Sequence, residues 1–161
     1  MRSKVVIRAF KLTARRKAVL LRLYSVHEDG SETLEATSAP VPMVAAAAIC
    51  KLFEAPYSVR PDIESLKRVL QVYGNTAWAS FVARDAYTAV QQARLLHDVS
   101  RARGALVIIT LAMDLNIVDT VGRVMNLIHR QAPNRLESSL LVTYDEALEG
   151  ELKVEVLWLG L

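Results

Sequence analysis

From residue 76 to the C-terminus, segments with the pattern of β-strands alternate with segments with the pattern of α-helices. The strand-like segments 76–82 and 105–110 are followed by the helix-like segments 85–99 and 116–131. In the last of these, apolar residues recur every three or four positions. Such alternation is typical of a β-sheet with helices packed on it, because each apolar stripe must be buried against a neighbouring layer.

Two more strand-like segments, 138–144 and 151–159, close the chain, and two helical segments, 43–55 and 61–73, precede residue 76. The expected order from residue 43 is therefore α–α–β–α–β–α–β–β. Only the short link DEALEG joins the last two strands, so we expect them to pair antiparallel. The pattern predicts a two-layer α/β sandwich on a mixed sheet, with helices packed on it, over residues 43–161.

The N-terminal part has a different pattern. Residues 4–38 are rich in β-branched and aromatic side chains, and the EDGS sequence is typical of a tight turn. These features predict an N-terminal β-meander. The segment APVP at 39–42 should end it, because proline cannot continue a β ladder. We therefore expect a β-meander extension at 1–42, followed by an α/β domain at 43–161.

The net charge of +3 conceals an asymmetry between the two ends of the chain. Residues 1–22 hold eight of the 20 Lys and Arg and no acid, so the rest holds 12 basic and 17 acidic residues. Such a basic end could bind nucleic acid, an anionic surface or another copy of the chain, or could simply protect a strand edge. With few aromatic side chains and no nucleic-acid motif, we expect a protein partner rather than nucleic acid. The predicted basic patch consists of Arg8, Lys11, Arg15, Arg16, Lys17 and Arg22.

Several classes of site have no support in the sequence. The single cysteine, Cys50, excludes an internal disulfide and a Cys-based metal site. The three histidines share no ligand spacing, so we expect neither a metal nor a cofactor. The longest apolar runs fall short of the ~20 residues that cross a bilayer, and the N-terminus is too charged for a signal peptide. We expect a cytoplasmic protein without a membrane span.

Three segments together resemble the C-terminal domain of the FtsZ/tubulin superfamily. RGALVIITLAMDLNIVDTV is similar to the family segment in which a strand, Asn-Ile-Thr and a glycine pair precede Asp-Leu at the start of a helix. YDEALEGELKVEVLWLGL resembles the closing strand pair of the family, and LKRVLQVYGNTAWAS resembles its helix and strand after the synergy loop. The resemblance covers about residues 43–161 and implies that domain's fold. The matching positions are Gly104, Ile109, Thr110, Asp114, Leu115, Asp145, Glu146, Leu148, Glu151 and Gly160.

The sequence departs from the family at the residues that handle nucleotide. Family members bind phosphate with a loop of closely spaced glycines, because backbone N–H groups must approach the phosphate. No two of the six glycines in this sequence are near each other. The family's glycine pair before Asp-Leu is replaced by Leu111 and Ala112. We expect that these residues bind no nucleotide.

The synergy loop also differs. In the family it reads roughly Asn-x-Asp-Phe-x-Asp/Glu, and its acids position water against the nucleotide of the next subunit. The corresponding RPDIES places Asp62 at the first acid, Ser65 at the second and Arg60 at the Asn. Losing one carboxylate removes a group that could polarise water, while Arg60 is a cation suited to phosphate. The resemblance implies that these three residues bind a partner; alternatively, Asp62 and Glu64 are ordinary first-turn helix acids.

These features together predict a non-catalytic protein-interaction or assembly module related to the cytoskeletal and cell-division proteins of this superfamily. It would bind or regulate a tubulin-superfamily filament, or self-associate as a homo-oligomer. The alternative is a small oligomeric α/β enzyme of the chorismate-mutase-like kind, with an acidic small molecule bound between subunits. The arginines that could bind such a molecule are Arg60, Arg84, Arg101 and Arg103.

Overall fold

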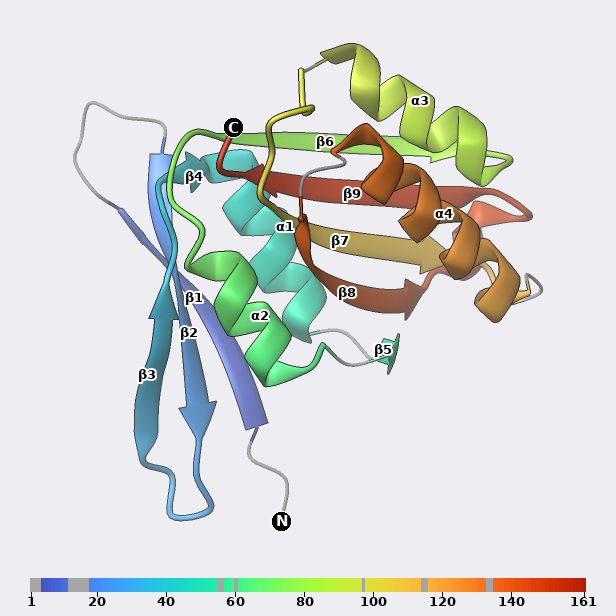
Figure 1. The fold of residues 1–161 in the computed structure, drawn as a ribbon. Coiled ribbons are helices and arrows are strands. Elements are labelled where there is room, and N and C mark those ends of the chain that lie inside the picture. The colour runs from blue at the N-terminus through green and yellow to red at the C-terminus, as the bar shows by residue number, and fades with distance from the viewer. Residues whose placement is uncertain are drawn as a thin grey trace.

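The computed structural model describes residues 4–11, 18–54, 57–59, 61–96, 98–113, 116–132 and 135–161. These residues form two β-sheets, which we call sheet A and sheet B, and four α-helices. Figure 1 shows sheet A on one side of the molecule and sheet B, with helices on both faces, on the other.

Sheet A is the N-terminal antiparallel sheet. Its order is β1-β2-β3, formed by β1 (Lys4–Lys11), β2 (Ala18–Val26) and β3 (Glu32–Thr37), so the predicted β-meander is confirmed. We had expected the APVP segment to end the strand pairing, but it does not. Strand β4 (Val41–Pro42) pairs with the start of β2, where Val41 lies opposite Val19. The proline is tolerated because it is the last residue of a very short strand.

Sheet B is a mixed sheet with the order β5-β8-β7-β9-β6. Strand β7 is parallel to β8 and antiparallel to β9, and β9 is antiparallel to β6. The mixed α/β sheet predicted from the sequence is therefore confirmed; the three-residue strand β5 was not predicted. The strands are β5 (Tyr57–Val59), β6 (Thr76–Ala83), β7 (Gly104–Leu111), β8 (Glu137–Tyr144) and β9 (Leu152–Leu159).

The prediction that the last two strands pair with each other is wrong. β8 and β9 do run in opposite directions, but β7 lies between them and pairs with both. The link 145–151 could span about 20 Å at ~3.3 Å per residue, well beyond the ~10 Å between strands that are one neighbour apart. The central position goes to β7, whose eight residues are all buried.

The helices cover sheet B on both faces. Helices α3 (Ala86–Leu96) and α4 (Ile117–Gln131) lie on one face, whereas α1 (Met43–Glu54) and α2 (Ile63–Leu70) lie between the other face and sheet A (Figure 1). Each face of sheet B has its own apolar cluster, and the cluster on the α1 and α2 side includes side chains from sheet A. We had predicted two layers, a sheet and the helices packed on it. Sheet A and a helix layer on the second face of sheet B add to these two.

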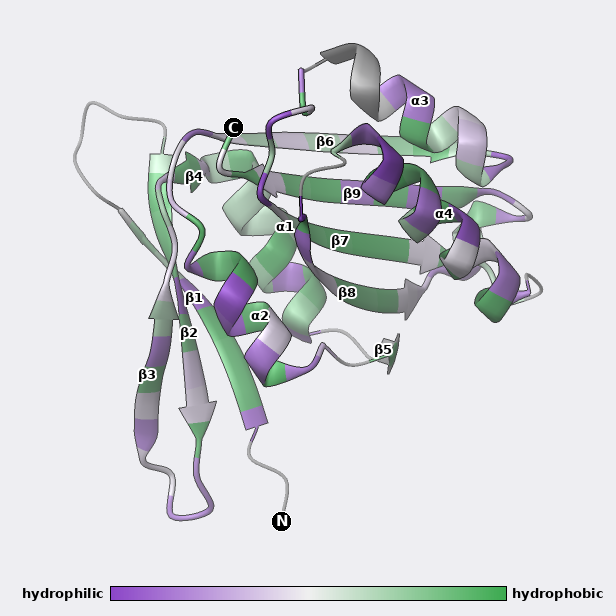
Figure 2. Ribbon diagram, viewed as in Figure 1, coloured by the Kyte–Doolittle hydropathy of each residue, from purple (hydrophilic) through white to green (hydrophobic). Residues whose placement is uncertain are grey.

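Hydropathy follows this layering. In Figure 2 the strands of sheet B are mainly hydrophobic, while α4 and β3 carry hydrophilic residues. Among the described helices, none has both the length and the apolar character required to span a membrane.

Candidate protein-interaction sites

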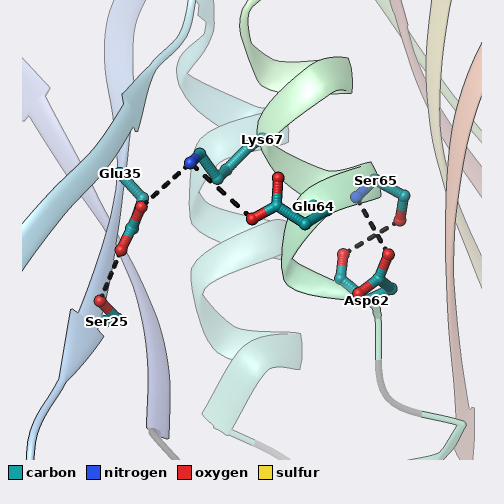
Figure 3. A network of polar contacts seen from close by, with 6 residues as sticks. All are labelled: Ser25, Glu35, Asp62, Glu64, Ser65 and Lys67. Atoms are coloured by element: carbon teal, nitrogen blue, oxygen red, sulfur yellow. Dashed lines mark hydrogen bonds and ion pairs between the residues drawn. The ribbon is translucent and has the colours of Figure 1, made fainter.

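The segment that resembles the synergy loop begins helix α2. Asp62 is the N-cap residue: its Oδ2 accepts a hydrogen bond from the backbone N–H of Ser65 at 3.3 Å, and Ser65 Oγ donates to the Asp62 carbonyl oxygen at 3.0 Å (Figure 3). Ser65 Oγ also lies 3.3 Å from Ser139 Oγ on β8. The Asp62 side chain thus satisfies one of the backbone N–H groups that the first helical turn leaves unpaired, that of Ser65. Asp62 remains exposed, whereas Ser65 is half-buried.

This geometry defines what the segment can do chemically. The Asp62 carboxylate is anchored to its own helix, and Ser65 supplies a hydroxyl where a second acid would be needed to polarise water. The third predicted residue, Arg60, lies outside the described residues. The exposed carboxylate of Asp62 can therefore face a partner. It has no second carboxylate beside it at position 65, because that residue is Ser65.

One helical turn further on, α2 is tied to sheet A. Lys67 Nζ lies 3.2 Å from Glu35 Oε2 on β3 and 3.9 Å from Glu64 Oε1, and Ser25 Oγ donates to Glu35 Oε1 at 2.8 Å (Figure 3). The hydrogen bonds from Ser25 and Lys67 lower the pKa of Glu35 below its usual value. The ion pair between Lys67 and Glu35 was not predicted, because it joins residues that are more than 30 positions apart in the chain.

The predicted basic patch contains two described side chains, Arg8 and Arg22, which lie opposite each other on β1 and β2. Arg8 forms a bidentate ion pair with Glu32, with N–O distances of 2.5 and 2.6 Å, and lies over the Tyr24 ring. This hydrogen bonding raises the pKa of Arg8 and lowers that of Glu32. Arg22 lies over the Phe10 ring, 4.4 Å from its centroid. The side chain of Lys11, and Arg15, Arg16 and Lys17 entirely, lie outside the described part of the chain.

The opposite end of the molecule carries an acidic turn (Asp145, Glu146, Glu149 and Glu151) between β8 and β9. It contains the short 3-10 helix Glu146–Leu148, capped by Asp145, whose Oδ1 accepts a hydrogen bond from the N–H of Ala147 at 3.0 Å. The turn is held to sheet B by a hydrogen bond from the N–H of Asp145 to the carbonyl oxygen of Leu111. Beyond Leu111, the side chains of Met113 and Val118 are 66% and 85% exposed.

One acid that the sequence did not single out is buried. Glu155 on β9 is only 3% exposed, and burial raises its pKa although Lys153 Nζ lies 3.7 Å from its carboxylate. Its Oε1 and the Thr110 hydroxyl have no hydrogen-bond partner among the described residues. No group of three or more His, Cys, Asp or Glu side chains in the described ranges is arranged to hold a metal ion.

The three described arginines of the alternative enzyme hypothesis do not converge within one copy of the chain. Arg84 follows β6 at the end of sheet B where β7 finishes, whereas Arg101 and Arg103 precede the start of β7. The Arg103 side chain donates instead to the Tyr73 carbonyl oxygen at 2.5 Å. Of the four arginines, Arg60 lies outside the described residues.

The fold can be compared with known proteins. The sequence matches no protein-family model and no curated protein. Among solved structures, it is similar to FtsZ of M. jannaschii in an empty dimer, with a TM-score of 0.62 and 22% identity over 72% of this chain and 36% of that one. For a single-residue variant of the same FtsZ, the TM-score is 0.62 and the identity is 23%, over 74% of this chain and 39% of that one. For CetZ2 of Haloferax volcanii, in a GTPγS-bound protofilament, the TM-score is 0.50 and the identity is 20%, over 71% of this chain and 37% of that one.

At these identities the similarity establishes a shared fold. The chain spans a little over a third of the length of each of these proteins. It therefore has the fold of one part of an FtsZ-like protein, as the resemblance of its motifs implied.

Proposed function

We propose that this chain is a non-catalytic protein-interaction or assembly module, which binds its own copies or a GTPase of the FtsZ/tubulin superfamily. The observation that carries the proposal is the FtsZ-like fold over about a third of FtsZ. Both M. jannaschii FtsZ, in a dimer, and CetZ2, in a protofilament, are proteins whose subunits contact one another. A chain with part of that fold is suited to the same kind of contact. Such a module would work in the cytoplasm, in a cytoskeletal or cell-division process.

The residues of the α2 N-terminus support a binding role over a hydrolytic one. Asp62 is an exposed acid held in a fixed orientation by its capping contacts, and the position of the second acid is occupied by Ser65. A single rigid carboxylate suits an ion pair with a partner, whereas activating water for attack on phosphate would need a suitably placed base. None of the six glycines in the sequence is close enough to another to form a phosphate loop.

The proposal is tested with the whole chain. Isothermal titration with GTP should give no measurable heat of binding, and the chain should co-sediment with filaments of a full-length FtsZ-like GTPase or sediment as an oligomer by itself. Micromolar affinity for GTP would overturn the non-catalytic assignment. A chain that stays monomeric and does not co-sediment with filaments of an FtsZ-like GTPase would overturn the assembly role.

A pair of substitutions locates the contact. Asp62→Asn keeps a good N-cap residue but removes the charge, so co-sedimentation should weaken about tenfold if the carboxylate faces the partner. Glu64→Gln, on the same helical turn, removes the same charge from an exposed side chain that is weakly paired with Lys67, and it should change little. Equal effects of the two substitutions would exclude a specific role for Asp62.

A further inference from the structure

Sheet A has one covered face and one open face. Along β2 the residues alternate between buried and half-buried, so that Leu21 and Leu23 face the core while Leu20, Arg22 and Tyr24 face away from it. The open face also carries large apolar side chains on the neighbouring strands, where Phe10 is 36% and Leu34 is 51% exposed. We call this surface the open face of sheet A. It combines apolar, aromatic and basic side chains, which is the composition of an interface core.

The two arginines at the centre of this face differ in their charge balance. Arg8 is neutralised by its bidentate pair with Glu32. Arg22 forms no ion pair with any described residue, and its Nε is buried without a hydrogen-bond partner among them. Its guanidinium is held against Phe10. An arginine fixed on an aromatic ring and lacking an anion is suited to a carboxylate from a partner.

Carboxylates without an ion-pair partner among the described residues lie at the other end of the molecule. The four acids of the acidic turn form no ion pair among the described residues. The turn is hydrogen-bonded to Leu111 at the end of β7, and Met113 and Val118, which follow β7 along the chain, have exposed side chains. The end of sheet B where β7 finishes therefore carries both negative charge and exposed apolar side chains, which complement the open face of sheet A in both properties.

We propose that one copy of the chain docks its acidic turn on the open face of sheet A of a second copy, with Arg22 as the anchor. Strand β9 begins on the side of the molecule that is remote from sheet A (Figure 1), so a single chain cannot join its own two surfaces. Two different surfaces that meet between copies form a heterologous contact, which extends head to tail unless the rotation closes a ring. The inference deepens the self-association that the proposed function includes.

The same face is poorly suited to single-stranded nucleic acid. Binding without sequence preference requires ring faces on which bases can stack. Here the Tyr24 and Phe10 rings are each covered by a guanidinium, at 5.1 and 4.4 Å from the ring centroids. One of those two charges is already neutralised by Glu32. A protein carboxylate, which needs the free guanidinium and no open ring, fits the face better.

Sedimentation velocity on the whole chain tests the contact. The wild type should associate with rising concentration at about 0.1 M salt and dissociate towards about 1 M, where the Debye length falls from about 10 Å to about 3 Å. Arg22→Glu and the double variant Glu146→Lys/Glu149→Lys should each weaken association about tenfold or more. Arg101→Glu makes the same charge change at an exposed arginine away from both surfaces, and it should associate like the wild type.

Mixing the two interface variants gives the decisive result. The Arg22→Glu chain keeps a working acidic turn, and the Glu146→Lys/Glu149→Lys chain keeps a working sheet A. Neither should associate as the wild type does by itself, but an equimolar mixture should regain association, because each variant carries the surface that complements the charge reversal of the other. The triple variant, which carries all three charge reversals, should regain self-association because both charges of the contact are exchanged.

Three outcomes would overturn the inference: a wild type that stays monomeric at low salt, variants that associate as the wild type does, or a mixture that stays monomeric although both variants show wild-type circular dichroism and thermal unfolding. If Arg22→Glu instead lost binding to a single-stranded RNA oligomer without any change in self-association, the face would be a nucleic-acid site. Titration with GTP and co-sedimentation with an FtsZ-like GTPase test the proposed function separately, since neither depends on this contact.

Discussion

Sheet A and sheet B are built from strands of similar length, but they bury their residues differently. Strand β7 at the centre of sheet B is buried at all eight positions, whereas β2 at the centre of sheet A alternates between buried and half-buried residues. The continuous apolar strand needs cover on both faces, and the alternating strand needs cover on one. The difference teaches that, among the described residues, sheet A has one face without cover, whereas sheet B is covered on both faces.

The largest effect that we expect is a difference in lost stability between leucine substitutions in sheet B, which is covered on both faces, and in sheet A, which is covered on one. Leu106→Ala removes a fully buried side chain from β7 and should lower the free energy of unfolding by about 2–5 kcal/mol, because it leaves a cavity. Leu34→Ala makes the same chemical change on the open face of sheet A, where the side chain is 51% exposed, and should cost less than about 1 kcal/mol. Urea titration followed by circular dichroism measures both. Equal losses would show that sheet A is covered on both faces.

A smaller effect concerns how the end of sheet B is closed. Gly160 follows β9 with φ +71°, and a Cβ there would lie 2.7 Å from Val72 Cγ1 and 2.9 Å from Arg103 Nε. Gly160→Ala should therefore destabilise by more than the ~1–2 kcal/mol that a left-handed backbone costs a non-glycine residue. Gly150→Ala is the matched control, since φ is +85° there but the space around it is open. If the thermal unfolding curves of Gly160→Ala and Gly150→Ala coincide, the close packing around Gly160 does not contribute to the loss of stability.

The smallest effect tests the contact that joins sheet A to α2. Glu35→Gln removes the charge that pairs with Lys67, and Glu64→Gln removes the more distant partner. The pKa of Glu35 is lowered in the folded chain from an ordinary value of 4.5. Its contribution to stability is therefore complete above about pH 4.5 and is lost as the pH falls through the lower, folded value. Thermal unfolding from pH 7 to acid should show the gap between wild type and Glu35→Gln closing, and a gap that persists in acid would contradict this sign.

Part of the candidate site could be predicted from the sequence because it is local. Asp62 before a helical apolar stripe indicates an N-cap, and the capping contacts with Ser65 need only three residues of chain. Arg8 and Arg22 could be placed in one strand pair for the same reason. The ion pair between Arg8 and Glu32 could not, because it depends on which strands adjoin. Without knowledge of that pair, the difference between Arg8, which is neutralised, and Arg22, which has no ion pair among the described residues, could not be predicted.

Other features depended on contacts between distant residues. The alternation of Lys153 and Glu155 along β9 indicates a solvent-facing edge, yet Glu155 is 3% exposed, because that face of sheet B is covered by the layer containing α1 and α2. The antiparallel direction of β8 and β9 follows from their short link, but their separation does not. Inserting β7 between them is favoured by burying its apolar residues, which a link-length argument does not count.

The sequence by itself determined the kinds of element: the N-terminal meander, the amphipathic helices, the apolar central strand and the motifs that resemble part of FtsZ. These are set by periodicity and turn chemistry over a few neighbouring residues. Only the tertiary structure decided that sheet A keeps an open face, and that Arg22, which has no ion pair among the described residues, and the acidic turn lie at opposite ends of the molecule. Both depend on the order and packing of layers, where burial of apolar surface from distant segments outweighs local preference.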